Sequence, residues 1–584
     1  MVPFLRLSRP LNTNQLPFQE GVVPPNATPK VDGFHGVAIR TKKISFPTLT
    51  TIILSLPFIL TIFLDFQGPS RIGLRGDLAL EDAAVRQASS FTRTLGVYDR
   101  FGWHHLGPAV FYIMAAPAHI FGSGQPSEYA AMAAWTAVCF VTPVRALWRA
   151  FDERVGIAAA VTISAFLALN LARPAFGPTS NPLGYLGSPW NPYITAPALI
   201  CATLCSLAAW KGDRAAFGWT ILSATVALQA HVASTFPVAL CGLLLVVASL
   251  RLRSPGLTPT RTGRTSLYVT TAIAALLWFP VLLNAVSNRG GNLRKVASYF
   301  FHENATHAVK RVLQAANAAS SAGLPPQPGV RDAFLGQGYR PATFFLLVAL
   351  PTLLLSIYGW RRRNFTLVAF AAMTISLWIL TAVSAHSIAG APYRYLLAWA
   401  VITPIPTWVG VTTAVLQRVP SSERTLTIIG CSLAFISCFL VATGPPLRAA
   451  GDPNVIRLAH AIELRVPRSS SVLLTTNRAR SIRDFALLVG CANELNADGF
   501  HSEVNGHPVE IIDTQFTLDG RQDFHASLLS SSSGDTFKRN FVLSEEGMSL
   551  FLYPLHSNVQ DTTPAMKHES TSSTSPRSRR NLKP

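Results

Sequence analysis

The sequence predicts an all-α polytopic membrane bundle that carries a small α/β domain near its carboxyl end. Of the 584 residues, 49% are hydrophobic and only 13% are charged, which is about half the charged fraction of a typical soluble protein. The mean hydropathy is +0.32. Apolar stretches near the ~20 residues that cross a bilayer recur along most of the chain. This composition excludes a disordered chain, a collagen-like fibre and a disulfide scaffold.

The net charge of +20 does not indicate nucleic-acid binding. Most of the 49 Lys and Arg side chains lie in short loops between apolar segments or in the termini, where they orient the chain and contact phospholipid. A nucleic-acid interface would need a folded basic face interleaved with aromatic residues, and none is visible. The seven cysteines lie mostly inside apolar segments, so they predict neither a disulfide framework nor a metal site.

The first apolar run covers residues 44–64 and follows a polar segment, residues 1–44, that ends in Arg40, Lys42 and Lys43. A secretory signal peptide would place its apolar core near the start and follow it with small residues. This run is late and long, so we expect a retained first span with a cytoplasmic amino terminus.

Ten further segments predict spans within a transmembrane domain, residues 45–443. They lie near 128–148, 155–172, 193–210, 215–232, 234–250, 266–286, 341–360, 365–385, 393–416 and 426–443. Short basic loops alternate with longer loops rich in Pro, Gly and Asn. The positive-inside rule places the basic loops in the cytoplasm and the longer loops outside.

One further apolar segment, residues 108–122, decides the topology. It has about 15 residues and contains Pro108 and Pro117, which is short for a span. We interpret it as a juxtamembrane or re-entrant helix of the first outer loop. Eleven spans then remain, and the chain after about Gly444 lies outside. If the segment does span, there are 12 spans and the carboxyl terminus is cytoplasmic.

Residues 451–556 predict an extracytoplasmic domain of mixed α/β structure. Residues 471–474 and 509–512 look like short strands, whereas residues 459–464 and 482–488 look helical. About 100 residues suffice for a small domain. Residues 557–584 are rich in Ser and Thr and end in basic residues, so we expect a disordered tail.

The first outer loop contains three acidic residues, Asp77, Glu81 and Asp82. Asp77 suits a helix N-cap, and Glu81 lies four residues later on the same helix face. Two carboxylates at a membrane surface suit general-base catalysis or divalent-metal binding. The alternative is an amphipathic helix whose acids cap it and face water.

The same loop continues with Arg100, Trp103, His104 and His105, and Tyr112 follows. Aromatic rings offer a stacking surface for a sugar, and Arg or His binds phosphate. The alternative is an aromatic belt at the membrane interface. The histidine pair lacks a third ligand nearby, so zinc is not favoured.

Polar residues also occur at the predicted outer ends of later segments, where an unpaired polar group is costly. They are Trp190, Asn191, His231, Tyr393 and Arg394, together with the basic, glycine-rich turn that contains Arg289, Arg294 and Lys295. Such a turn suits an anion. Helix capping by Asn191 and snorkelling by Arg394 are the alternatives. All of these residues face the predicted outer side.

The order of these motifs resembles the GT-C superfamily of integral membrane glycosyltransferases. The motifs are the acidic helix after the first span, Trp103-His104-His105-x-Gly-Pro-x-x-Phe-Tyr, Trp190-Asn191-Pro192 and Tyr393-Arg394-Tyr395. The resemblance covers residues 45–443 and is strongest to the aminoarabinose-transferase and protein mannosyltransferase group, including actinobacterial cell-envelope members. Residues 451–584 match no family, although GT-C members often carry an extracytoplasmic carboxyl-terminal domain.

The resemblance implies transfer of a sugar from a polyprenyl-phosphate donor to a glycan, lipid or protein acceptor of the cell envelope. The reaction would invert the anomeric carbon at the extracytoplasmic face of the plasma (inner) membrane. Asp77 would be the general base, with Glu81 or Asp82 orienting the acceptor. Family members commonly have a second, separated acid, and the choice among Glu81, Asp82 and Asp99 stays open.

The remaining candidates fall into two groups in this scheme. Arg394 would bind the donor phosphate, with Arg289, Arg294, Lys295 and Arg100 as further cations. The substrate-binding candidates are Trp103, His104, His105, Tyr112, Trp190, Asn191, His231 and Tyr393. No cofactor is expected, and a metal-independent reaction is favoured over one with a divalent metal. The alternatives are a transporter or flippase of a lipid-linked substrate, or a non-catalytic scaffold. Repeated halves and mid-span charges typical of transporters are not visible.

Overall fold

The computed structural model of the chain describes residues 46–69, 71–99, 101–121, 124–172, 183–252, 261–302, 307–321, 341–388, 393–419, 422–447, 451–476, 482–505, 524–530, 541–545 and 548–554. The predicted cytoplasmic amino terminus, the predicted strand at 509–512, the predicted tail and Arg100 lie outside these residues.

The predicted helical membrane bundle is confirmed. In the described residues, ten helical segments are long and apolar enough to cross a membrane. They are α1 (Phe46–Phe66), α4 (Gln125–Ala150), α5 (Glu153–Leu171), α6 (Asn191–Trp210), α8 (Thr235–Leu252), α9 (Arg261–Ser287), α12 (Pro341–Phe344) continued by η4 (Phe345–Ala349) and α13 (Leu350–Arg361), α14 (Phe365–His386), η5 (Arg394–Ile402) with α15 (Ile405–Arg418), and α16 (Ser422–Thr443). The eleventh predicted span corresponds to α7 (Arg214–Ala230), which has 17 residues and is shorter than each of these ten segments.

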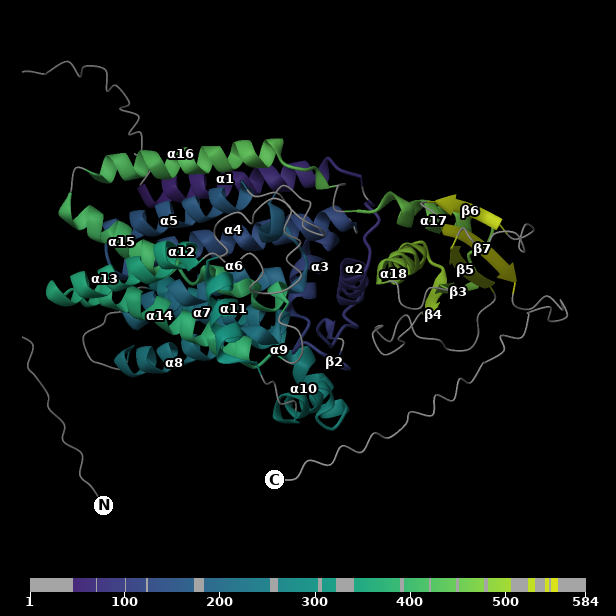
Figure 1. Cartoon of the computed structure of the whole chain (residues 1–584), viewed down its shortest axis with the longest axis horizontal. Coiled ribbons are helices and arrows are strands. Elements are labelled where there is room, and N and C mark those ends of the chain that lie inside the picture. Colours follow the sequence, from purple (N-terminus) through teal and green to yellow (C-terminus); the bar gives the residue numbers. More distant parts are fainter. Residues whose placement is uncertain are drawn as a thin grey trace, which may run out of the picture. The chain divides into compact units, whose positions relative to one another are not determined.

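The bundle is built around α6, whose side chains are almost all buried. It packs against α4, α7, α8 and η5. By contrast, α9 and α16 expose large apolar side chains, among them Leu276 and Phe439. Such an exposed apolar face suits contact with lipid tails, which are as apolar as leucine. Figure 1 shows α16 beside α1, its packing partner.

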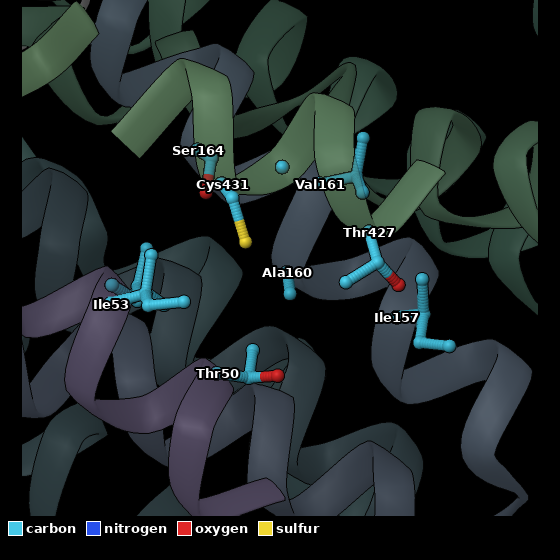
Figure 2. Close-up of a pocket in the computed structure, with 10 residues that line it drawn as sticks. Thr50, Ile53, Ile157, Ala160, Val161, Ser164, Thr427 and Cys431 are labelled. Atoms are coloured by element: carbon cyan, nitrogen blue, oxygen red, sulfur yellow. The ribbon is translucent and has the colours of Figure 1, made fainter. Parts of the chain in front are cut away.

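A small cavity of about 30 Å³ lies between α1, α5 and α16 (Figure 2). Its lining is apolar apart from small groups such as Thr50, Ser164 and Cys431. A cavity needs at least about 10–15 Å³ of such volume to hold one water, so this one has room for one or two waters at most. We therefore interpret this cavity as a packing gap between small side chains, away from the residues that bear chemistry.

The predicted first outer loop forms α2 (Asp77–Ser89), a two-strand pair β1 (Tyr98–Asp99) and β2 (Trp103–His104), and α3 (Ala109–Phe121). A helix of 13 residues is about 20 Å long, whereas the hydrocarbon core is about 30 Å thick. The helix α3 therefore cannot cross the bilayer, as predicted for segment 108–122, and it packs against α2 and α4. The remaining short helices are η2 (Gly184–Gly187), η3 (Val232–Ser234), α10 (Gly291–His302) and α11 (Val309–Ser320).

The carboxyl-terminal residues have the predicted mixed α/β structure. They form α17 (Pro453–Glu463), β3 (Ser471–Thr476), α18 (Ile482–Ala497), β4 (His501–Asn505), β5 (Phe524–Ser530), β6 (Phe541–Glu545) and β7 (Met548–Pro554). The strand order is β4-β3-β5-β7-β6 (Figure 1). The pairs β3–β4 and β3–β5 are parallel, and the other two pairs are antiparallel. Apolar faces of both helices pack on Val472 and Leu474 of β3.

The helix α18 holds the segment that leads into α2. The backbone amide of Gly76 donates a hydrogen bond to the carbonyl oxygen of Ala486 in α18 at 3.0 Å. The backbone amide of Asp452, just before α17, donates to the carbonyl oxygen of Gly73 at 2.8 Å. Gly490 makes this contact possible, because a Cβ atom there would lie 2.4 Å from the Leu74 carbonyl oxygen. The segment that leads into α2 is therefore positioned by residues of α18 and of the turn before α17, which lie about 380 to 420 positions later in the sequence.

We expect Gly490→Val to push α18 away from this segment. Overpacking of a close contact costs about 1–3 kcal/mol. The expected result is faster amide hydrogen exchange in residues 72–89, measured by mass spectrometry. Gly242→Val is the matched control, because a Cβ atom at Gly242 in α8 meets no atom within 4 Å. Unchanged exchange in residues 72–89 would contradict this account.

Candidate functional site

The candidate site begins at the amino-terminal end of α2. Gly76 has a φ of +57°, which glycine adopts without steric cost, and the helix starts at the next residue. Asp77 is therefore the first helical residue, and the prediction that it is the N-cap is wrong, because Gly76 takes that position. The Asp77 carboxylate instead accepts a hydrogen bond from Trp190 Nε1 at 3.2 Å. It still lies where the helix dipole favours an anion.

Glu81 lies one turn further along the same face and is 1% exposed. Its Oε1 accepts a hydrogen bond from the backbone amide of Asn191 at 2.9 Å. The Asn191 side chain donates to the carbonyl oxygen of Ala230 at 3.0 Å, which joins the start of α6 to the end of α7. Asp77 and Glu81 thus both contact the Trp190-Asn191 motif, as expected for two acids four residues apart.

The two carboxyl groups have raised pKa values. Burial raises the pKa of Asp77, and the hydrogen bond from Trp190 partly opposes this effect. Asp77 is accessible at the surface, yet the surrounding protein displaces enough water from its carboxyl group to disfavour the charge. Burial also raises the pKa of Glu81 well above its usual value; the Asn191 amide opposes this, and the charge of Asp77 adds to it. A carboxylate with a raised pKa is a stronger base.

Aromatic rings surround Trp190. The ring centroids of Trp190 and Tyr193 are 4.9 Å apart, and those of Trp190 and Tyr395 are 5.2 Å apart. Tyr393 lies 5.7 Å from Tyr395 in a stacked arrangement. Sequence reasoning did not choose Tyr193 or Tyr395 as candidate site residues, although Tyr395 belongs to the motif Tyr393-Arg394-Tyr395 and Tyr193 directly follows Trp190-Asn191-Pro192. These rings form an aromatic surface beside Asp77. Arg394 lies between Tyr393 and Tyr395 in the sequence, at the start of η5.

Asp82 has a different environment, about 140° around the helix from Asp77. Its Oδ2 accepts hydrogen bonds from Arg86 Nη1 at 2.7 Å, Asn493 Nδ2 at 2.7 Å and Gln125 Nε2 at 3.3 Å. Burial opposes the charge of Asp82, but the Arg86 charge and the hydrogen bonds of Glu128 and Asn493 hold its pKa below the usual value. These contacts place Asp82 in the junction of α2 with α18 and α4.

Four of the predicted substrate-binding residues form a second cluster. Trp103 and His105 are buried, and the rings of His105 and His231 lie 4.5 Å apart. Asn292 of α10 accepts from the backbone amide of His104 at 2.7 Å and donates to its carbonyl oxygen at 2.6 Å. Burial lowers the pKa of His105 well below its usual value, and the neighbouring histidines add to this. His105 is therefore neutral near pH 7, which suits packing better than phosphate binding.

The structure also identifies a role for Arg93, which the sequence alone did not reveal. Its buried guanidinium donates to the carbonyl oxygens of Leu95 at 2.7 Å and Gly96 at 2.6 Å. The hydroxyl of Tyr112 donates to the Arg93 carbonyl oxygen at 2.7 Å. Arg93 and Tyr112 thus brace the connection between α2 and α3. The feature of the sequence that could have indicated this role is the position of Arg93 between two short helices.

The predicted phosphate-binding residues are only partly described. Arg289, Arg294 and Lys295 are exposed at the start of α10, next to the cluster of Trp103 and the histidines. Arg289 has a φ of +49°. In the described residues, no group of three His, Cys, Asp or Glu side chains has the geometry to hold a metal ion.

No family model and no curated protein sequence matches this chain. Solved structures do match. ArnT from Cupriavidus metallidurans bound to undecaprenyl phosphate aligns with a TM-score of 0.52 at 13% identity, over 87% of this chain and 98% of that chain. The apo state of the same protein aligns with a TM-score of 0.52 at 12% identity, over 86% and 97%. The chain has the fold of ArnT.

The archaeal oligosaccharyltransferase AglB from Archaeoglobus fulgidus aligns with a TM-score of 0.41 at 14% identity, over 83% of this chain and 69% of that chain. That value is too low to support an argument. The alignment with ArnT extends beyond the predicted transmembrane domain, because 87% of this chain is covered. The predicted multi-pass helical architecture is therefore confirmed, and the chain shares its fold with ArnT.

Proposed function

We propose that this protein is a GT-C glycosyltransferase that moves a sugar from a polyprenyl-phosphate donor to a cell-envelope acceptor. The observation that carries the proposal is the accessible Asp77 carboxylate, which has a raised pKa and lies beside Trp190 in a chain with the fold of ArnT. The structure of ArnT with undecaprenyl phosphate supports a polyprenyl phosphate as the lipid part of the donor.

In the proposed reaction, the Asp77 carboxylate removes the proton of the acceptor hydroxyl while that oxygen attacks the anomeric carbon of the donor. The bond from the anomeric carbon to the phosphate oxygen breaks at the same time, and the polyprenyl phosphate leaves with the electron pair. A single displacement of this kind inverts the anomeric centre. Arg394 is our first candidate for stabilising the departing phosphate, followed by Arg289, Arg294, Lys295 and Arg100.

Glu81 is our choice for the second acid. It is buried against the amide of Asn191, so it fixes the start of α6 relative to Asp77. Asp82 is engaged by Arg86 and Asn493 and serves to position α2. We therefore propose Asp77 as the catalytic base, Glu81 and Asp82 as positioning residues, and the rings of Trp190 and Tyr395 as a sugar-stacking surface.

The side of the membrane follows from the charge pattern. The basic loops predict that α2 and residues 451–556 face the extracytoplasmic side of the plasma membrane. A cysteine introduced at Ser90, which is exposed at the end of α2, would be labelled by an impermeant maleimide in intact cells. Labelling only after permeabilisation would contradict this orientation.

The proposal is tested by sugar transfer in liposomes. The purified protein would be offered a panel of polyprenyl-phosphate sugars, and transfer would be followed by mass spectrometry of the acceptor fraction. Transfer with one donor supports the enzyme. Movement of a lipid-linked sugar across the bilayer without transfer would support a flippase and overturn the proposal.

The pH dependence of transfer provides a second prediction. Replacing Trp190 with phenylalanine keeps a ring but removes the donor that lowers the pKa of Asp77. The pKa of Asp77 should therefore rise further, and a smaller fraction of the base is ionised at low pH. We expect the acidic limb of the kcat profile to shift to higher pH in Trp190→Phe. Trp135→Phe is the control, because Trp135 is buried in α4. An unshifted limb in Trp190→Phe would argue against Asp77 as the titrating base.

A further inference from the structure

The helix α10 follows closely after the end of the span α9. The apolar surface of α9 continues to Val286, which is 81% exposed. The turn after it is tight, because Arg289, Gly290 and Gly291 all have positive φ values and the amide of Gly290 donates to the carbonyl oxygen of Ala285 at 2.7 Å. The helix α10 therefore begins within a few residues of the lipid-facing end of α9. With 12 residues it is about 18 Å long, too short to cross a bilayer.

The helix α10 has three distinct sides, because positions three and four apart share a helix face. The first side packs on β2, as Figure 1 shows. Asn292 and Val296 of this side are buried, and Asn292 binds both backbone groups of His104. The second side is apolar and consists of Leu293, Ala297, Phe300 and Phe301, and the third is polar and consists of Arg294, Lys295, Ser298 and His302.

The apolar side of α10 is open to the surroundings of the protein. Phe301 is 84% exposed and Phe300 is 45% exposed. The neighbouring Tyr299 instead packs inward, with its ring 5.5 Å from that of Trp103. In water, two exposed phenylalanine side chains forfeit the free energy of burying apolar surface. At a membrane interface, aromatic and apolar side chains of an amphipathic helix enter the boundary between headgroups and acyl chains.

The polar side of α10 is cationic. Arg294, Lys295 and, in the turn before the helix, Arg289 are exposed. None of the three forms an ion pair with another residue that the structure describes, and residues 287–302 contain no Asp or Glu. The positive-inside rule does not account for these cations, because their loop is predicted to lie outside. Cations beside the apolar side of an interfacial helix attract acidic phospholipids.

We propose that α10 lies in the membrane surface and binds acidic phospholipids. Phe300 and Phe301 would insert among the acyl chains. Arg289, Arg294 and Lys295 would bind the phosphate groups of the lipid heads. Because α10 is joined to β2, this contact would also fix β2 at the membrane surface. The lipid contact is independent of the proposed sugar transfer.

The test measures which lipid surrounds the apolar side. Phe301→Cys should fold, because the side chain is 84% exposed, and it would carry an environment-sensitive fluorophore. The full chain would be reconstituted in vesicles of equal amounts of phosphatidylcholine and phosphatidylglycerol, without polyprenyl phosphate. Two preparations would differ only in which lipid carries brominated acyl chains, which quench the fluorophore. We expect brominated phosphatidylglycerol to quench about twofold more strongly, because the cations enrich the acidic lipid nearby.

Three controls localise the preference. Leu276→Cys places the same fluorophore in the middle of α9, where the side chain is 71% exposed, so both lipids should quench it equally. Arg294→Gln and Lys295→Gln, combined with Phe301→Cys, should keep the quenching and remove most of the preference. Arg457→Gln is the matched charge control and should keep the preference, because Arg457 is an exposed cation of α17. The unsubstituted chain reports labelling of the native cysteines.

Four results would overturn the lipid-binding role of α10. Without quenching at Phe301→Cys by either lipid, α10 would lie in water. Equal quenching by both lipids, an equally large preference at Leu276→Cys, or an unchanged preference after the double substitution would show that α10 does not select acidic lipid. Thermal unfolding would check the folding of every variant. No sugar donor is present, so a failure of the proposed transfer leaves this result unaffected, and the reverse also holds.

Discussion

Asp77→Asn is expected to reduce sugar transfer by about 10²- to 10⁴-fold, the usual contribution of a general base. Asparagine has nearly the same shape and keeps an oxygen that accepts the hydrogen bond of Trp190. It has no basic carboxylate, so the acceptor proton has no receiver. Initial transfer rates in liposomes measure the effect, with folding followed by thermal unfolding in detergent.

The control for Asp77→Asn is Glu153→Gln, which alters an exposed acid at the start of α5. This variant should transfer at the wild-type rate. If folded Asp77→Asn retained more than a tenth of wild-type activity, Asp77 would not be the base, and Glu81→Gln would become the next variant to measure.

Asp82→Ala is expected to separate α2 from α18. The substitution leaves Arg86, Asn493 and Gln125 without the carboxylate that binds all three. Breaking a buried ion pair costs about 3–5 kcal/mol. We expect about 3 kcal/mol, because Arg86 is one-third exposed and water partly compensates for the lost contact. That free energy corresponds to an increase in local opening of roughly 100-fold, which hydrogen exchange in residues 77–89 and 482–497 would report.

A second Asp–Arg pair provides the control for Asp82→Ala. Asp213 accepts a hydrogen bond from Arg149 at 2.8 Å, and its side chain is 7% exposed. This pair lies at the start of α7, on the predicted cytoplasmic side. Asp213→Ala should increase exchange there and leave α2 unchanged. Slow exchange of α2 in Asp82→Ala would show that the polar network does not hold the two helices together.

The bundle and the location of the acids were predictable from local patterns. A bilayer demands about 20 apolar residues in each crossing helix, so the spans are visible as runs in the chain. The spacing of Asp77 and Glu81 places both acids on one helix face whatever the helix contacts. The parallel pairing of β3 with β4 around a helix also agrees with the strand and helix predicted near 471–488.

The roles of individual side chains depended on partners far away in the sequence. Periodicity predicts which residues share a face, but it does not predict what that face meets. Asp82 is adjacent to Glu81, yet its partners Gln125 and Asn493 lie 43 and 411 positions away. His105, one of the two adjacent histidines, likewise packs against His231, which lies far away in the sequence.

By itself, the sequence predicted a multi-pass membrane protein, an acidic helix after the first span and an α/β carboxyl-terminal region, and the order of its motifs resembled the GT-C superfamily. These features follow from hydropathy, helical periodicity and motif order, all of which are local. Only the tertiary structure decided that Asp77 meets Trp190 while Asp82 binds α18, and that a polar cavity lies between α2, α4 and α18. Burial, hydrogen bonding and pKa are set by contacts between distant segments, and those contacts exist only once the chain has folded.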